Sequence, residues 1–124
     1  MKSTDLMVGD WVMIPPNIFV QIEEIKIELG EYRMYLKDTA VFVTEEDIDP
    51  IPLTPEILEK NGAYKTKLMG EDRHFEYCLD GFTMLAIYDA DFSFQINGGA
   101  RKIKYVHQLQ HALKLCGIAK EIII

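Results

Sequence analysis

The sequence predicts an α+β protein in which a small N-terminal β-barrel is followed by a short helix, a three-stranded antiparallel meander and a C-terminal helix. Three observations support this fold class. Short β-rich runs separated by turn residues fill the first fifty positions. Alternating aromatic runs flank the hairpin signal Asp80-Gly81. The run 103–117 has the period of an amphipathic helix.

The predicted barrel is built from four or five short runs, at 6–14, 19–27, 32–36 and 40–43, with 48–51 as the fifth. The second run contains the adjacent Glu23 and Glu24, which interrupt its alternation and predict a β-bulge. Gly30 supplies the next turn. Strands this short suit a closed or half-closed barrel, because closure removes the exposed edges that would otherwise pair with other chains.

A proline-rich stretch predicts the boundary between two parts, 1–53 and 54–124, of which the second forms one compact unit. Thr54 is a suitable helix N-cap, and Pro55 occupies the first helical position, where its missing N–H costs nothing. Gly62 closes this short helix.

The meander consists of 74–79, 82–88 and 92–96, and its aromatic faces are expected to be covered by the last helix. On a helical wheel, one side of that helix is apolar and is expected to be buried: Tyr105, Val106, Leu109, Ala112, Leu113 and Cys116. His107 and His111 fall on the opposite side and are expected to face solvent. Gly117 is placed to end the helix in a left-handed conformation, and 122–124 are expected to add a strand to a sheet.

The net charge of −7 lies entirely in residues 1–53, which carry four basic and eleven acidic residues. This imbalance disfavours nucleic-acid binding by the first part and is typical of a solvated surface or of a docking surface for a basic partner. The longest apolar runs are far too short to cross a membrane, and the N-terminus lacks the pattern of a secretory signal. We therefore expect a cytoplasmic protein with two free thiols, Cys78 and Cys116.

The pair His107 and His111 is the sharpest chemical signal, because it has the spacing of the H-E-x-x-H motif of zinc peptidases. The position of the catalytic glutamate is occupied by Gln108, whose amide cannot act as a general base. His74 is the candidate third ligand. The interpretations left open are surface histidines, a metal-binding protein and a degenerate hydrolase. The sequence assigns no catalytic residue and implies no cofactor.

A second interpretation concerns a short basic strip from Arg101 to Lys114, which includes Lys102 and Lys104. Such a strip can contact phosphates, but it carries no interleaved exposed aromatic residues and belongs to an acidic chain. Nucleic-acid binding is therefore the weaker alternative.

Three segments carry a resemblance to a group of short proteins encoded by gut anaerobic bacteria and their phages or mobile elements. They are LMVGDWV at 6–12, IDPIPLTPEILEKNG at 48–62 and IKYVHQLQHALKLCGI at 103–118. No activity is attached to this group, so the resemblance implies a bacterial, prophage or mobile-element context and no site residue. The first segment is also similar to the opening of Src-homology-3 (SH3) barrels, which makes the predicted barrel SH3-like. Because the chain lacks a catalytic set, the first hypothesis is a non-enzymatic protein-binding or assembly module.

Overall fold

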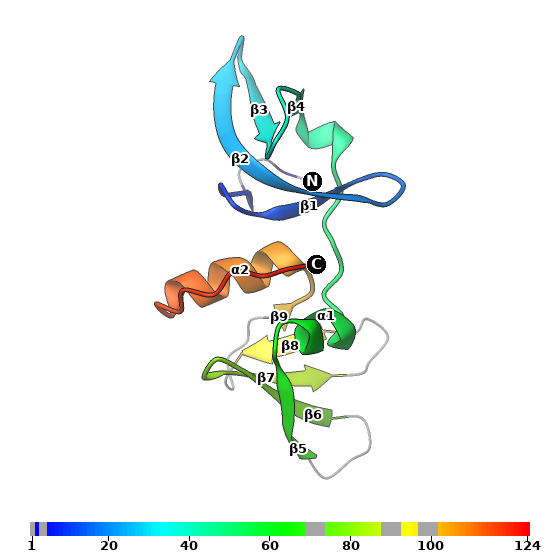
Figure 1. Cartoon of the computed structure of the whole chain (residues 1–124), viewed down its shortest axis with the longest axis vertical. Helices are drawn as coiled ribbons and strands as arrows, with labels where there is room; N and C mark the ends of the chain where they lie inside the picture. Colours follow the sequence, from blue (N-terminus) through cyan, green and yellow to red (C-terminus); the bar gives the residue numbers. More distant parts are fainter. Residues whose placement is uncertain (1, 3–4, 69–73, 88–92, 97–101) are drawn as a thin grey trace. The chain divides into compact units, whose positions relative to one another are not determined.

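The chain forms two compact units, residues 1–51 and residues 52–124, in the computed structural model (Figure 1). The structure describes residues 2, 5–68, 74–87, 93–96 and 102–124, and at 66–68, 74–76, 83–87 and 93–96 this description covers the backbone. The α+β class predicted from the sequence is confirmed. Each unit has its own sheet.

Unit 1 is a four-stranded antiparallel sheet in which each strand pairs with the next along the chain. Its strands are β1 (Trp11–Ile14), β2 (Ile18–Glu28), β3 (Glu31–Leu36) and β4 (Phe42–Val43). The long, curved β2 pairs with β1 through its first half and with β3 through its second (Figure 1). The register shifts between Ile22 and Glu24, so the predicted bulge at the two glutamates is confirmed.

The sequence predicted a closed or half-closed barrel, and the described part of unit 1 forms a four-stranded antiparallel sheet without a closed barrel. After β4 the chain makes the short 3-10 helix η2 (Glu45–Asp47) and then touches β1 at a single bridge. At that bridge the N–H groups of Met13 and Asp49 each donate to the other's carbonyl oxygen, at 2.9 and 2.8 Å. The expected last strand at 48–51 is therefore reduced to one paired residue, and the sheet stays open beside it.

The core of unit 1 is apolar and is drawn from every strand and from the segments before and after them. Its buried members are Leu6, Val12, Ile22, Met34, Leu36, Val43 and Ile48. Asp10 is also fully buried, and its carboxylate accepts the N–H of Met7 at 2.8 Å. The Gly-Asp turn therefore belongs to the interior of the unit, because this bond closes the loop that leads into β1.

Unit 2 contains a five-stranded antiparallel sheet, where the sequence predicted three strands. The strands are β5 (Tyr64–Leu68), β6 (His74–Leu79), β7 (Phe82–Ile87), β8 (Ser93–Ile96) and β9 (Lys102–Ile103). The two outer strands were missed because β5 alternates weakly and β9 has only two residues. Asp80 and Gly81 have positive φ values of 48° and 85°, so the predicted two-residue turn between β6 and β7 is confirmed.

Both helices of unit 2 are capped as the sequence predicts. Helix α1 (Pro55–Lys60) begins where the Thr54 hydroxyl accepts the N–H of Ile57, at 3.3 Å. Helix α2 (Val106–Leu115) is shorter than the predicted helix, because its first expected residue belongs to β9. It ends with Gly117 at φ +71° and with the N–H of Ile118 donating to the carbonyl oxygen of Leu113, which is the Schellman arrangement.

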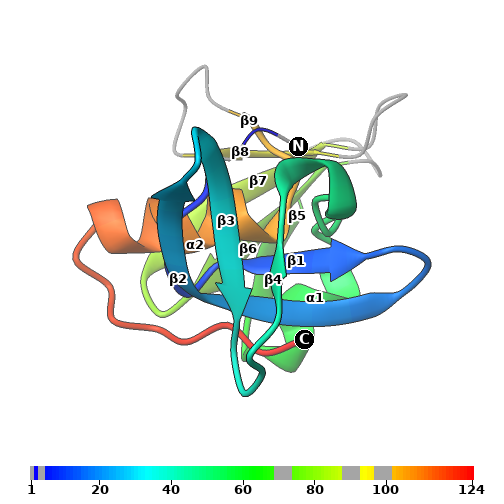
Figure 2. The same ribbon diagram turned by 90° about the horizontal axis from the view of Figure 1, so that it is seen from above.

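The C-terminal segment forms no strand, so the prediction for 122–124 was wrong. It runs back toward α1 (Figure 2) and is held there by the side chain of Asn61. The amide of Asn61 donates to the Ile123 carbonyl oxygen and accepts the Ile123 N–H, both at 2.8 Å. This side chain satisfies the two backbone groups that a neighbouring strand would otherwise have satisfied. Neither helix in the described part of the chain has the length and apolarity that a membrane span requires.

Candidate functional site

The first candidate, the pair His107 and His111, lies on α2 in unit 2. The two imidazole rings meet edge to face with centroids 5.7 Å apart, and the His107 ring stacks on Tyr105 at 6.0 Å. The His107 side chain is buried, with 6% of the residue exposed, and His111 is half-buried. The expectation that both rings face solvent was therefore wrong.

Burial along α2 changes with position along the axis as well as with the side of the helix. In the first turn Val106, His107 and Leu109 are all buried, although the wheel placed His107 on the polar side. In the last turn Leu113 is buried, but Leu115 is 79% exposed, and Cys116 at the C-cap is exposed although the wheel placed it on the buried side. A helical wheel cannot describe such a gradient, since it assigns one burial to a whole side.

A metal site at this pair gains no support from the described residues. Among them, no group of three His, Cys, Asp or Glu residues is arranged to hold a metal ion. His74 lies on β6, but its side chain is outside the description, so its predicted role as third ligand stays a prediction. Gln108 has a structural role, because its carbonyl oxygen accepts the N–H groups of Lys104 and Tyr105 at 2.8 and 3.2 Å and so caps the start of α2.

The basic strip from Arg101 to Lys114 is interrupted. Arg101 is outside the described residues, and the buried His107 separates Lys104 near the start of α2 from Lys114 near its end. Surface charges that follow a nucleic-acid backbone normally form a continuous track. The strip therefore stays a prediction without added support.

Unit 2 contains a cavity of about 300 Å³ beside α2. Its apolar walls are formed by Phe82 at the start of β7, Ile103 on β9 and Ala112 on α2, with Leu115 at the exposed rim. Lys102, Gln108, His111 and Cys116 provide its polar groups. No carboxylate is present among the described residues that line it.

The second candidate site is the tip of the β2–β3 hairpin in unit 1. Leu29 and Gly30 form its two-residue turn and have φ values of +52° and +77°, which is the type I′ pattern. The side chain of Leu29 is 95% exposed. A leucine in this conformation strains the backbone and, at this exposure, contributes nothing to the core.

An apolar stripe leads from the core of unit 1 to this tip. Ile25 pairs with the buried Met34, and two residues further along the same face Ile27 pairs with Tyr32. Paired residues of antiparallel strands share a face, so these side chains continue the core-facing side of the hairpin. Ile27 is 65% exposed and Tyr32 is 38% exposed, because the hairpin extends past the end of the core.

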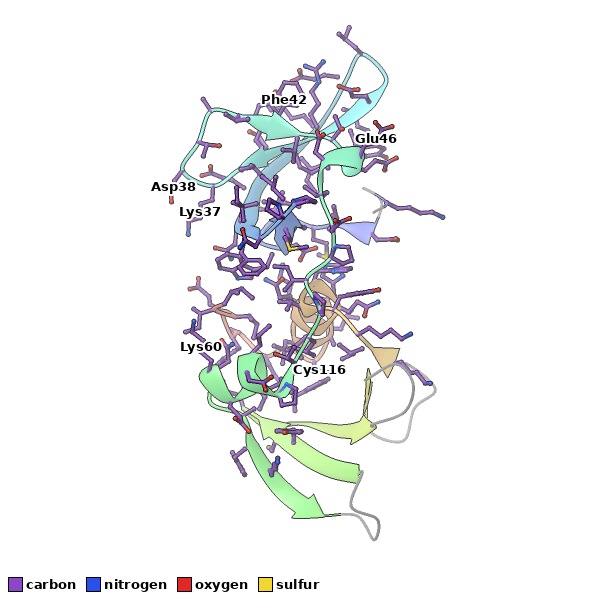
Figure 3. The ribbon with its side chains drawn as sticks, turned by 90° about the vertical axis from the view of Figure 1, so that its right-hand side faces the viewer. Lys37, Asp38, Phe42, Glu46, Lys60 and Cys116 are labelled. Carbon is purple, nitrogen blue, oxygen red and sulfur yellow. The ribbon has the colours of Figure 1, made fainter. Side chains whose placement is uncertain are left out.

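A groove of about 260 Å³ adjoins this tip and separates it from η2. Gly30, Glu31 and Tyr32 form one side, and the other side is formed by Thr44, Glu45 and Glu46. Glu46 is labelled on the short helix in Figure 3. The hairpin tip therefore combines exposed apolar side chains with an acidic groove.

The opposite face of the hairpin is tied together by Arg33. Its guanidinium donates to Glu28 at 2.9 Å and to Glu31 at 3.1 Å, and it lies 4.5 Å from the ring centre of Phe42 on β4. The hydrogen bond to Glu31 and the negative charge of Glu28 raise the pKa of Arg33, so it stays charged. This network joins β2, β3 and β4 on one face of the hairpin.

Sequence reasoning did not identify the hairpin tip as a site. The sequence predicted a turn at Gly30 but no role for Leu29 before it. The available signal was the pair Leu-Gly in a position where Asn-Gly or Asp-Gly is preferred. The same chain uses Asp80-Gly81 for the equivalent turn of unit 2.

No family model, curated protein or solved structure matches this chain.

Proposed function

We propose that the protein is a non-enzymatic binding module whose unit 1 takes up a basic, partly apolar segment of a partner protein at the tip of the β2–β3 hairpin. The observation that carries the proposal is Leu29, a fully exposed leucine in a left-handed turn position. An exposed leucine in this turn position favours neither the folding nor the solubility of unit 1. A side chain that costs stability without contributing to the core is typical of a functional surface.

The apolar part of the proposed surface is the stripe formed by Ile27, Leu29 and Tyr32. Contiguous exposed apolar side chains on an ordered element are typical of protein interaction sites. The Arg33 network on the other face keeps the hairpin rigid, so that little conformational entropy is lost on binding.

The negative charge of the groove indicates the class of partner. The groove beside the stripe contains Glu31, Glu45 and Glu46, and the first part of the chain carries the whole net charge of −7. Arg33 compensates Glu31, and the two glutamates of η2 add further carboxylates to the groove. A segment with an apolar anchor and neighbouring Lys or Arg residues matches this surface in both respects.

The fold supports the same proposal. Four antiparallel strands, a short 3-10 helix and a return to the edge of β1 follow one another in the order of an SH3-like module. We propose that unit 1 is an open variant of that arrangement, acting in the cytoplasm of a bacterium or on behalf of a prophage or mobile element. Small modules of this kind present binding surfaces between loops of a rigid sheet.

A displayed library of random peptides tests the proposed binding. The full chain is expected to enrich peptides that combine an apolar residue with Lys or Arg, and their binding should weaken as salt is raised. Burying a leucine side chain is worth about 1.5–3 kcal/mol, so Leu29→Asn should weaken binding about tenfold to a hundredfold. Fluorescence anisotropy with the selected peptides measures the change.

Val41→Asn is the matched control, because Val41 is also an exposed apolar residue of unit 1 but lies outside the stripe. It should leave the affinity unchanged. The proposal fails if no peptide is enriched over the starting library, or if the selected peptides bind the Leu29→Asn protein as tightly as the original.

A further inference from the structure

We propose that the partner segment binds in an extended conformation and adds a short strand to the edge of β3 beside Tyr32, an inference that rests on the proposed function and specifies its partner. A segment that joins a sheet edge is held by main-chain hydrogen bonds, and its alternate side chains give specificity. The proposal therefore depends on where the backbone groups of β3 point and on where β4 ends.

The backbone groups of β3 alternate between its two neighbours in the sheet. The N–H of Leu36 donates to the carbonyl oxygen of Val41, in the segment that leads into β4, at 3.3 Å. The next N–H along the chain, that of Lys37, donates to the carbonyl oxygen of Gln21 on β2 at 2.9 Å. This alternation continues along an antiparallel strand, so every second residue before Leu36 faces the β4 side. The N–H and the carbonyl oxygen of Tyr32 therefore point to the β4 side of the sheet.

Strand β4 ends before it reaches Tyr32. Its last pair is Met34 with Val43, and the chain then turns into η2 at Glu45. If β4 continued by two residues, Glu45 would lie opposite Tyr32. Among the described residues, none forms a hydrogen bond with the N–H or the carbonyl oxygen of Tyr32. Such a pair of groups on a sheet edge is a template for a further strand.

The groove between the hairpin tip and η2 lies beside this edge. Its volume is about 260 Å³, with Tyr32 on one side and Glu45 and Glu46 on the other. A residue bound opposite Tyr32 would place its side chain on the face that Tyr32 shares with Ile27. The residues before and after it would project to the other face, which carries Glu31. An apolar anchor with Lys or Arg at an adjacent position matches this alternation.

The peptides selected from the displayed library test the proposal on the ligand side. Each is N-methylated at one position at a time, which removes a backbone N–H and keeps the side chain. Methylation at the residue opposite Tyr32 should weaken binding about tenfold, because a main-chain hydrogen bond is lost. Methylation at the two adjacent positions should leave the affinity unchanged, because their N–H groups point away from β3. Fluorescence anisotropy measures this alternation.

Hydrogen exchange of the Tyr32 amide, followed by nuclear magnetic resonance, tests the proposal on the unmodified protein. In the free protein the Tyr32 N–H should exchange faster than the N–H of Arg33, which faces β2. With a selected peptide at about ten times its dissociation constant, exchange at Tyr32 should slow about tenfold by mass action. Exchange at Arg33 should stay unchanged.

Two substitutions at Tyr32 separate its backbone from its side chain. Tyr32→Pro removes the N–H, and proline is tolerated on the open side of an edge strand. Tyr32→Ala is the matched control, because it removes the same ring and keeps the N–H. The proline variant should bind selected peptides about tenfold more weakly than the alanine variant. The fluorescence of Trp11 on β1 shows whether unit 1 of each variant is folded.

The outcomes distinguish this inference from the proposed function. If no peptide is enriched, the proposed function fails and strand addition fails with it. If peptides bind through Leu29 but N-methylation shows no alternation, strand addition is refuted and the binding function stands. An unprotected Tyr32 amide in the complex, or equal binding by the folded proline and alanine variants, refutes strand addition in the same way.

Discussion

Leu29→Asn should make unit 1 more stable while removing its proposed binding function. Leu29 has a φ of +52° and is 95% exposed, so the substitution removes backbone strain and no buried surface. An L-residue in the left-handed region costs about 1–2 kcal/mol, and asparagine tolerates that region far better than leucine. We expect the free energy of unfolding of unit 1 to rise by about 1 kcal/mol, which corresponds to a rise in Tm of about 4–8 °C for a domain of this size.

The chain offers a specific probe for this measurement. Trp11 is the single tryptophan and lies on β1, so its fluorescence reports the urea unfolding of unit 1. Both helices lie in unit 2, so far-ultraviolet circular dichroism follows that unit. The midpoint of the fluorescence transition should rise in Leu29→Asn, while the helix signal should unfold as in the original protein.

The reciprocal change is made at the equivalent turn of unit 2. Asp80 has a φ of +48°, so Asp80→Leu should lower the stability of unit 2 by about 1–2 kcal/mol. Asp80 also forms an exposed ion pair with Lys120 at 3.5 Å, and Asp80→Asn removes that charge while keeping a residue suited to the turn. A Leu29→Asn protein that unfolds at lower urea, or an Asp80→Leu protein as stable as Asp80→Asn, would refute the reasoning.

Two further substitutions test the buried polar contacts. Asn61→Ala removes three hydrogen bonds of 2.8 Å, two to the backbone of Ile123 and one to the carbonyl oxygen of Ile57 in α1. It should destabilise unit 2 by about 3 kcal/mol, as measured by circular dichroism in urea. A loss below about 1 kcal/mol would contradict the assigned role of this side chain. Asp10→Ala removes the buried acceptor of the Met7 N–H and should destabilise unit 1 by about 2–3 kcal/mol in the tryptophan fluorescence assay. An unchanged midpoint would show that water replaces that bond.

The features predicted correctly from the sequence depend on contacts between residues close together in the chain. Thr54 caps α1, Gly117 ends α2, and Asp80-Gly81 makes a hairpin turn, in each case through bonds that span a few residues. The bulge at Glu23 and Glu24 follows from the same kind of local pattern. Such signals can be read from the sequence because the partners of each group lie within a few positions.

The features that were missed depend on partners far along the chain. His107 is buried although the helical wheel of α2 alone places it on the polar side. The C-terminal residues are held by Asn61, which is 62 positions away from Ile123, and not by a sheet. The exposure of Leu29 depends on where the core of unit 1 ends, which no local pattern specifies. Local propensity therefore predicted the elements, but it could not predict which of their surfaces stay uncovered.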